Sequence, residues 1–316
     1  MYKNIMWIEK YRPYKIADIA NQKEIISSLK SLLKKELELP HMLFSGTAGI
    51  GKTTTALCMV REILGSNWKD FTLELNASDE RGINMVRERV KKFSKFYSLS
   101  TEIPFKMIIL DEADEMTSDA QTALRRIIED ASLHCRFILI ANNVSKIIEP
   151  LQSRCAVFKF SKISDINIVE HLKKISKLEN IKFDDSGLKM ITNYVNGDLR
   201  HAINILQATS SLGAITTKNA KVVLGLTKDK HVDLVLKLAL DGNIFQARTK
   251  MIELIKIQGM SETDFLKLIN QAVFKSKIND LSEAIKIIAK YDYRVLVGAN
   301  PEIQLTALLS ELGNLK

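Results

Sequence analysis

The hydrophobic and polar positions of this chain follow two different patterns, one before and one after about residue 163. In the first part, short apolar runs alternate with stretches whose apolar residues recur at helical spacing. The runs, in chain order, are HMLFSG, FTLELNAS, KMIILDEAD, CRFILIANN and AVFKFSK. Fully apolar strands that alternate with helices are typical of a parallel sheet covered on both faces. The first part is therefore predicted to be an α/β domain.

The two ends of the chain differ from this alternation. Before residue 41 we expect an extended arm containing WIEKYRP, followed by a helix through IISSLKSLLKK. After residue 163 one amphipathic helix follows another, with glycines between them. The charged stretch TKDKH interrupts this helical part. We therefore predict three domains, namely an α/β domain over 1–162, a small helical domain over 163–228 and an all-helical domain over 229–316.

Composition narrows the class of protein only slightly. The 316 residues include 46 Lys and Arg against 37 Asp and Glu, a formal net charge of +9, which makes nucleic acid a reasonable partner without proving one. The three cysteines include no C-x-x-C pair, which argues against a zinc module and against a disulfide framework. No apolar run approaches the ~18 residues of a membrane span. We expect an intracellular protein of a reducing compartment.

The strongest chemical signal is GTAGIGKT, residues 46–53, which matches G-x-x-x-x-G-K-[ST] and lies between an apolar strand and a helix. Its glycines let the backbone curve so that N–H groups face phosphates. Lys52 would reach the β- and γ-phosphates, and the Thr53 hydroxyl would bind Mg²⁺. We therefore predict a nucleoside triphosphate site formed by Gly46, Thr47, Ala48, Gly49, Ile50, Gly51, Lys52, Thr53 and Thr54.

A second signal is the pair of carboxylates that ends KMIILDEAD. A buried strand places Asp111 and Glu112 at its carboxyl end, where ligands bind in open α/β sheets. Asp111 would be the carboxylate associated with Mg²⁺, and Glu112 would orient and deprotonate an attacking water. Together with the phosphate loop, these residues predict a nucleoside triphosphatase.

Two further positions are candidates for the same site. Asn142 ends the strand FILIAN, where its amide would contact the γ-phosphate or the water, although neighbouring Asn143 leaves the assignment open. Arg200 lies near the start of a helix after a glycine-containing turn, which would suit an arginine folding over the nucleotide from a second domain.

Six stretches resemble the small subunits of replication factor C, the AAA+ clamp-loader proteins of archaea and eukaryotes. They occur in the family's order and spacing and cover roughly residues 5–230. The stretches are WIEKYRP (7–13), GTAGIGKTT (46–54), ELNASDERGI (74–83), DEADEMTSDAQTALRRIIE (111–129), IIEPLQSRC (147–155) and GDLRHAIN (197–204).

The resemblance implies an architecture and an activity. The fold would be a RecA-like ATPase domain with a small helical lid and a helical collar that holds a hetero-pentameric ring of large and small subunits. The activity would be ATP hydrolysis, stimulated by DNA and by the clamp. It would open sliding clamps of the proliferating-cell nuclear antigen type and load them onto primer–template DNA. The compact termini favour archaeal origin, hence cytoplasm or nucleoid; a eukaryotic chain would work in the nucleus.

The resemblance also implies roles for single residues. Arg154 of the Ser-Arg-Cys triplet would be an arginine finger that reaches the ATP of the neighbouring subunit, where a guanidinium stabilises charge on the transferring phosphoryl group. Arg154 has no acidic neighbour in sequence, and we expect its partner in another subunit. Cys155 is expected to be a small buried residue at the start of a strand. Tyr11, Arg12 and Ile19 match positions that border the adenine.

The stretch RGINMVRERVKKFSKFY is expected to be a DNA-facing helix. Val86, Val90, Phe93 and Tyr97 would form its buried stripe, and the basic residues Arg87, Lys91 and Lys95 fall four apart on an adjoining face. Such a face is also compatible with a solvated surface. By the resemblance, Arg81, Arg87, Lys91 and Lys146 would contact the DNA backbone, with little base specificity. Phe96 would help face the clamp or simply pack.

Two other interpretations stay open at the level of sequence. The chain would be a mainly structural subunit if its ATP site served only assembly. Alternatively, it would be an AAA+ DNA translocase or branch-migration helicase. A motor of that kind would be expected to carry a winged-helix module in place of the long helical C-terminal part, and the Ser-Arg-Cys triplet also argues against it.

Overall fold

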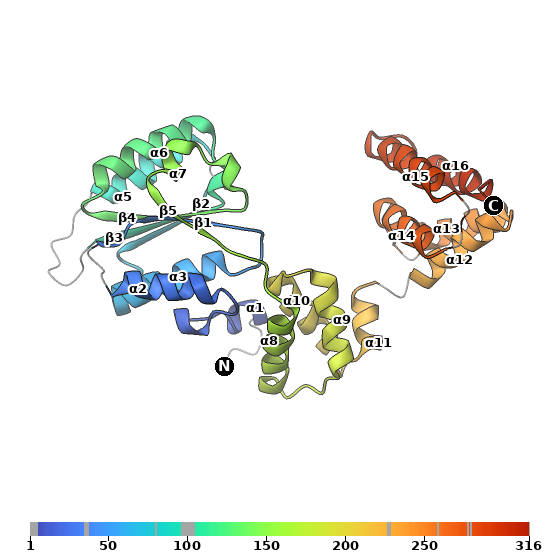
Figure 1. Cartoon of the computed structure of the whole chain (residues 1–316), viewed down its shortest axis with the longest axis horizontal. Helices are drawn as coiled ribbons and strands as arrows, with labels where there is room; N and C mark the ends of the chain where they lie inside the picture. The colour runs from blue at the N-terminus through green and yellow to red at the C-terminus, as the bar shows by residue number, and fades with distance from the viewer. Residues whose placement is uncertain are drawn as a thin grey trace. The chain divides into compact units, whose positions relative to one another are not determined.

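The computed structural model describes residues 6–34, 38–79, 81–95, 105–225, 229–257, 259–276, 278 and 280–315. The chain divides into two compact units, residues 1–220 and 221–316, which Figure 1 shows in blue to yellow and in orange to red. The first unit contains the predicted α/β region together with the small helical region. The division of that unit into an ATPase domain and a lid remains our prediction.

The first unit is built on a five-stranded, all-parallel sheet in the order β2-β3-β4-β1-β5. All five strands match apolar runs of the sequence, which confirms the predicted α/β class. Residues in the three central strands are almost wholly buried. The strands are β1 (His41–Ser45), β2 (Thr72–Asn76), β3 (Lys106–Asp111), β4 (Cys135–Ala141) and β5 (Cys155–Lys159).

Helices cover both faces of this sheet (Figure 1). One face carries α2 (Lys23–Leu33) and α3 (Lys52–Leu64). The other carries α6 (Ser118–Ala131) and the helical segment 83–95. The buried side chains of these two segments form one core with those of the strands. Since every strand runs in the same direction, the carboxyl ends meet at one edge, where Asn76 pairs with Asp111 and Ser45 with Ala141.

The N-terminal arm is not extended throughout, and this part of the prediction was wrong. Trp7–Lys10 form a short helix, α1, and Ile16–Asp18 form a 3₁₀ turn, η1. The side chain of Trp7 is buried, and the backbone N–H of Trp7 donates to Oε1 of Gln207, on α10 (Leu199–Ser210), at 3.0 Å. This one-turn helix therefore depends on tertiary contacts rather than on local sequence preference.

The predicted DNA-facing helix contains an irregular turn. It consists of α4 (Ile83–Met85), a π-helical turn η4 (Val86–Val90) and α5 (Lys91–Lys95). Val86 and Val90 are buried as expected, and Phe93 is half-buried against the same core. Tyr97 and Phe96 lie outside the described residues. Because a π turn holds an extra residue, the regular four-residue spacing does not hold through this segment.

The connections within the α/β region are short. They include η3 (Gly65–Asn67), η5 (Ala113–Glu115), η6 (Val144–Lys146) and α7 (Glu149–Gln152). The last of these leads through Ser153 and Arg154 into β5.

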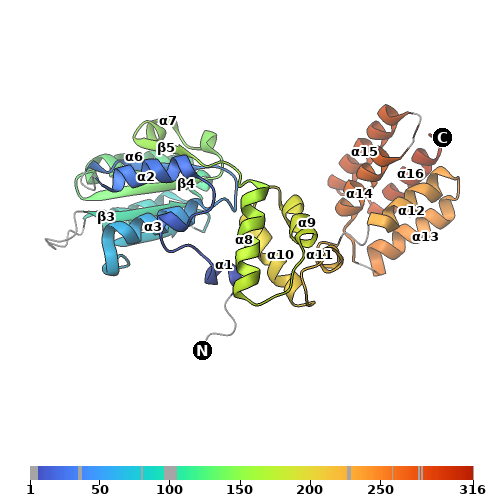
Figure 2. The same cartoon turned by 60° about the horizontal axis from the view of Figure 1, so that its bottom comes forward.

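The rest of the first unit is helical. It comprises α8 (Asp165–Leu178), α9 (Asp185–Val195) and α10 (Leu199–Ser210), and α11 (Thr217–Val223) crosses the boundary to the second unit. Ser164, Asp184 and Asp198 cap the first three of these helices with their side chains. Extended structure does not stop fully at residue 163, because Phe183 and Ile215 form an isolated parallel bridge. Figure 2 shows α1 beside α8 and α10.

The second unit is a bundle with its own apolar core, as predicted for an all-helical part. Its helical elements are α12 (Asp229–Leu240), α13 (Ile244–Ile252), η8 (Glu253–Ile257), α14 (Glu262–Lys275), α15 (Leu281–Leu296) and α16 (Pro301–Gly313). None of the helices in the described part of the chain combines the length and the apolar composition needed to span a membrane.

Candidate nucleotide-binding site

The phosphate loop connects β1 to α3 through three glycines in left-handed or otherwise glycine-favouring conformations. Their φ angles are 144° at Gly46, 73° at Gly49 and 97° at Gly51. A Cβ atom at Gly49 would lie 1.8 Å from Oδ1 of Asp198, the residue that caps α10. Gly49 is thus required both by its backbone conformation and by the close approach of the helical region.

Lys52 begins α3 with its ammonium group turned into the loop. Nζ donates to the backbone oxygens of Gly46 at 2.6 Å and Thr47 at 2.8 Å, and to Oδ1 of Asn142 at 3.0 Å. Burial lowers the pKa of Lys52, and the nearby carboxylate of Asp111 opposes this effect. The side chain therefore joins the phosphate loop to the end of β4.

Thr53 and Asp111 lie in direct contact at the carboxyl edge of the sheet. The Thr53 hydroxyl donates to Oδ2 of Asp111 at 2.7 Å. The next residue, Glu112, adopts the left-handed backbone conformation with φ 53° and ψ 38°. Its backbone N–H donates to Oδ1 of Asp111 at 2.9 Å. Asp111 thus contacts the first turn of α3, whereas Glu112 directly follows the end of β3.

The structure separates the two candidate asparagines. Asn142 turns its side chain to Lys52, whereas Oδ1 of Asn143 accepts from the backbone N–H of Ser145 at 3.0 Å and caps η6. The carboxylate of buried Asp114 holds both residues, since its two oxygens accept from their backbone N–H groups at 3.1 and 3.0 Å. Only Asn142 of this pair faces the phosphate loop.

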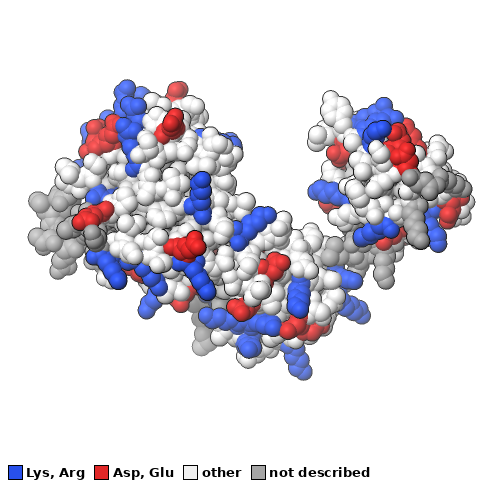
Figure 3. All heavy atoms as spheres, in the orientation of Figure 1, with Lys and Arg blue, Asp and Glu red and all other residues white. Residues whose placement is uncertain are grey.

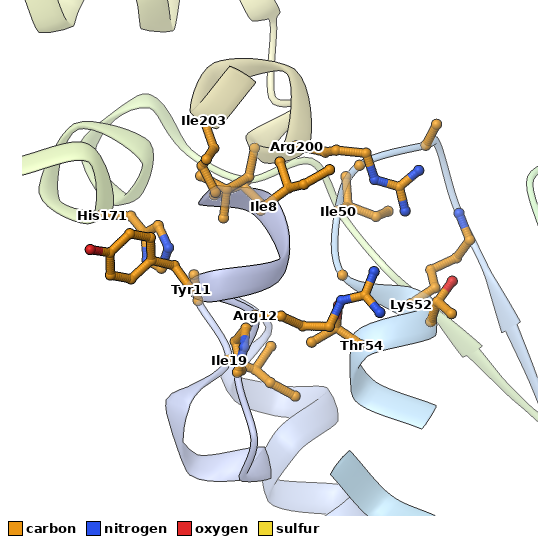
Figure 4. Close-up of a pocket in the computed structure, with 18 of the residues that line it drawn as sticks. Ile8, Tyr11, Arg12, Ile19, Ile50, Lys52, Thr54, His171, Arg200 and Ile203 are labelled. Carbon is orange, nitrogen blue, oxygen red and sulfur yellow. The ribbon is translucent and has the colours of Figure 1, made fainter. Parts of the chain in front are cut away.

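A single pocket brings together most of the predicted site residues (Figure 4). The loop residues from Ala48 to Thr54 line it, and so do Asp111, Glu112, Asn142 and Arg200. Arg200 comes from α10, and Leu199 beside it donates its backbone N–H to the Gly49 oxygen at 3.2 Å. The helical region is therefore hydrogen-bonded to the phosphate loop itself.

The opposite end of the pocket is mostly apolar. Tyr11, Arg12 and Ile19, the positions expected to border adenine, all line this pocket. The Tyr11 hydroxyl donates to Oε1 of Glu179 at 2.6 Å, and Arg12 is ion-paired with Glu9 at 2.8 Å. In the view of Figure 4, Tyr11 and His171 lie on one side of the pocket and Lys52 lies on the other. The pocket thus has a polar end at the loop and an apolar end with aromatic side chains.

Arg154 has an acidic partner within its own chain, contrary to our expectation. Its guanidinium is ion-paired with Oε1 of Glu129 on α6, and Nη1 donates to the Pro150 oxygen at 2.8 Å. In the described part of the chain, Arg154 is not among the residues lining the nucleotide pocket. Cys155 is half-buried rather than buried, and desolvation raises the pKa of its thiol to about 12.

The predicted DNA contacts are surface residues with acidic neighbours. Lys146 and Arg81 both face Glu115, at 3.0 Å and 3.8 Å. Arg87 and Lys91 line a groove between the irregular helical segment and α6, which also contains Asp119, Arg126 and Asp130. On the face shown in Figure 3, basic and acidic side chains are intermixed. The geometry therefore shows no continuous basic patch on this face.

Sequence reasoning missed three residues that shape the site, namely Asp114, Asp198 and His171. Asp114 lies within the quoted strand-end motif but received no role. Asp198 precedes a helix and is a preferred capping residue, so the helix-start rule would have found it. No sequence signal placed His171 at the pocket, because its position depends on how α8 packs.

The parallel sheet, the glycine loop, the strand-end carboxylates and the helical region that closes over them define an ATPase of the AAA+ class. Sequence models agree. The ATPase family associated with various cellular activities (AAA) matches residues 42–162, a RCF1/5-like AAA+ ATPase lid domain matches 170–211, and the replication factor C C-terminal domain matches 227–311.

Relatives that align over nearly the whole chain identify the family within this class. The replication factor C small subunit of Sulfolobus acidocaldarius is 44% identical over 99% of this chain and 97% of its own length. That of Staphylothermus marinus is 44% identical over 98% of this chain and 94% of its own length. The chain belongs to the replication factor C small subunit family, as its motifs indicated.

Solved structures of similar fold include Thermotoga maritima RuvB. A single-residue variant of that protein aligns with a TM-score of 0.57 over 78% of this chain and 87% of its own length, at 14% identity. The Holliday junction branch migration motor of the same organism aligns with a TM-score of 0.56 over 81% and 84%, at 15% identity. At this identity the likeness extends to the AAA+ fold alone.

Proposed function

We propose that this chain is an ATP-hydrolysing small subunit of a replication factor C clamp loader, which opens a ring-shaped sliding clamp and loads it onto primer–template DNA. One observation carries the proposal. The phosphate loop, both carboxylates, Asn142 and Arg200 converge in one pocket, while Arg154 lies outside it. An intact site that lacks its arginine finger suits a subunit that hydrolyses ATP only beside a neighbour.

Within the site, Lys52 binds the β- and γ-phosphates, and Thr53 and Asp111, whose side-chain oxygens lie 2.7 Å apart, would hold Mg²⁺. This donor set fits the metal, because Mg²⁺ prefers oxygen ligands and is commonly bound through one or two carboxylates and the substrate's phosphates. Glu112 orients and deprotonates the attacking water. Asn142 and Arg200 contact the γ-phosphate from β4 and from the helical region.

Arg154 acts in the complex rather than in its own pocket. Exposed ion pairs contribute little, about 0–1 kcal/mol, so the Glu129 pair is a weak restraint on a side chain that is about a third exposed. A phosphate of the neighbouring subunit's ATP would be a stronger partner. In this proposal the guanidinium exchanges Glu129 for that phosphate on assembly, which makes hydrolysis conditional on the ring.

The remaining roles follow the family. Residues 1–162 form the ATPase domain, 163–228 the lid and 229–316 the collar that joins the subunits of the hetero-pentamer. Arg81, Arg87, Lys91 and Lys146 contact the DNA backbone, after exchanging their present acidic neighbours for phosphates. Because the relatives are archaeal, we place this work in the cytoplasm.

A reconstituted complex tests the proposal. The chain is co-purified with its large subunit, its mass is measured, and labelled clamp is offered with primed DNA. We expect clamp to be retained on DNA only with hydrolysable ATP, and less efficiently as salt rises. A complex that migrates branched DNA but never loads a clamp would contradict the proposal.

A further inference from the structure

His171 is a polar side chain at the apolar end of the nucleotide pocket. It lies on α8 and lines the same pocket as Tyr11, Ile8 and Ile203 (Figure 4). The side chain is half-buried. Within the described residues, its imidazole makes no hydrogen bond or ion pair. A half-buried imidazole without a protein partner can form hydrogen bonds with a ligand in the pocket.

The surroundings of His171 favour the neutral imidazole. Burial lowers the pKa of His171, and the charge of Lys174 lowers it further. A neutral imidazole offers one N–H donor and one nitrogen acceptor. The hydroxyl of Tyr11, which lines the same pocket, donates its hydrogen to Glu179 and can therefore only accept from a ligand.

The polarity of the pocket fixes how a nucleotide lies in it. The loop at Lys52 takes the phosphates, so the base occupies the end lined by Ile8, Tyr11, Ile19 and His171. The isoleucine side chains there offer surface for stacking but no hydrogen bonds. Adenine has one strong donor, its exocyclic amine, which would lose its water partners in this environment.

We propose that the imidazole of His171 accepts a hydrogen bond from the exocyclic 6-amino group of ATP. This rests on the proposed ATP site. His171 is then a specificity-determining residue on the lid, which reads the base while Arg200, on the same helical region, is directed at the phosphates. The lid thereby contacts both the base and the phosphates of the same nucleotide.

A nucleotide without the amino group tests this directly. Purine riboside 5′-triphosphate differs from ATP by that group alone, and its Kd is compared with that of ATP by calorimetry on the full-length chain. GTP is a poorer probe, because the imidazole can turn its N–H towards the guanine carbonyl. We expect the wild type to bind the analogue about tenfold more weakly, as one net hydrogen bond predicts.

The variants assign the effect to His171. In His171→Leu the two nucleotides should bind equally, whereas His171→Gln, whose amide oxygen can accept, should restore part of the tenfold ratio. His201→Leu is the matched control, because His201 is exposed on α10 and is not among the residues lining the pocket. It should keep the full ratio.

The results separate this inference from the proposed function. A wild-type ratio near one, or a tenfold ratio that survives in His171→Leu, overturns the role of His171 while leaving ATP binding and clamp loading intact. Selective ATP binding that depends on His171, in a complex that loads no clamp, would support His171 and reject the clamp-loader proposal. If His171→Leu fails to fold, the wild-type ratio and His171→Gln still decide.

Discussion

Arg154 and Glu129 form an ion pair within one chain, and the same oxygen of Glu129 lies 3.8 Å from Nε of Arg125. One carboxylate oxygen therefore lies near two guanidinium groups, one on α6 and one just before β5. Within the single chain, this exposed pair is therefore a weak restraint on Arg154.

Replacing Arg154 by alanine should separate binding from hydrolysis. In Arg154→Ala, ATP affinity should stay within a few-fold, because the residue does not line its own pocket. Steady-state hydrolysis by the assembled complex should fall at least about 100-fold, since arginine fingers contribute 10³–10⁵ in comparable enzymes. Phosphate release by the complex and by the isolated chain is compared.

The matched variant Glu129→Gln removes the ion pair but keeps the guanidinium. It should retain hydrolysis in the complex to within a few-fold, because the pair is exposed and weak. An equal loss of hydrolysis in the isolated chain and in the complex of Arg154→Ala would show that Arg154 does not act in trans.

The two adjacent asparagines should give opposite phenotypes. Asn142→Ala removes an acceptor of Lys52 in the site and should lower kcat about 10- to 100-fold, in the range of one lost polar contact to a transition state. Asn143→Ala removes the cap of η6 and should cost about 1 kcal/mol of stability with little change in kcat. Turnover and urea denaturation are measured on both; a larger kcat loss in Asn143→Ala would exchange their roles.

Gly49 should be far less tolerant of substitution than a glycine outside the site. In Gly49→Ala the new methyl group would collide with the Asp198 carboxylate, which would displace α10 or the loop, and ATP affinity should fall at least about tenfold. Gly65→Ala is the control, because Gly65 has φ 63° but open space around it. It should lose about 1 kcal/mol of stability and keep its ATP affinity. Equal affinities in the two variants would remove Asp198 from the explanation.

Stability should depend on pH through His41, which begins β1. Burial, and then the charge of Arg136, lower the pKa of His41 to about 4 from 6.5. His41 therefore binds a proton more readily in the unfolded state than in the folded state. The free energy of unfolding should fall as the pH drops from about 6.5 towards 4. The loss from this group is at most about 3 kcal/mol.

Urea denaturation of the full chain between pH 4 and 7 measures this dependence. His41→Asn should flatten the curve, because the Asn oxygen can replace Nδ1 as the acceptor for the Phe137 N–H. His171, whose pKa is also lowered, acts in the same direction, so some slope should remain. An unchanged slope in His41→Asn would exclude His41 as a source.

The parts of the fold and site that sequence predicted are those set by local pattern. The phosphate loop, its flanking strand and helix, and the strand-end carboxylates are contiguous in sequence, and parallel strands bring their carboxyl ends together. By contrast, α1 is joined to α10 by the hydrogen bond from Trp7 to Gln207, and the π turn at Val86–Val90 buries both valines in a core shared with α6. Neither has a distinct local pattern.

Contacts between distant residues were not predictable for the same reason. Arg154 lacks an acidic neighbour in sequence, yet α6 brings Glu129 to it. Gly49 lies in the phosphate loop, and Asp198 lies at the start of α10. Only the folded structure shows that the Asp198 carboxylate leaves no space for a side chain at position 49. His171 likewise enters the pocket from a helix without any motif of its own.

The left-handed backbone of Glu112 has a cost that the chain must carry in every folded molecule. A non-glycine residue in this conformation is strained by about 1 kcal/mol or more. Glycine or asparagine would relieve part of it, yet neither could deprotonate a water. If Glu112 is the base that we propose, this is a position where the most stable sequence and the most active sequence differ, and selection for thermal stability alone should favour its replacement.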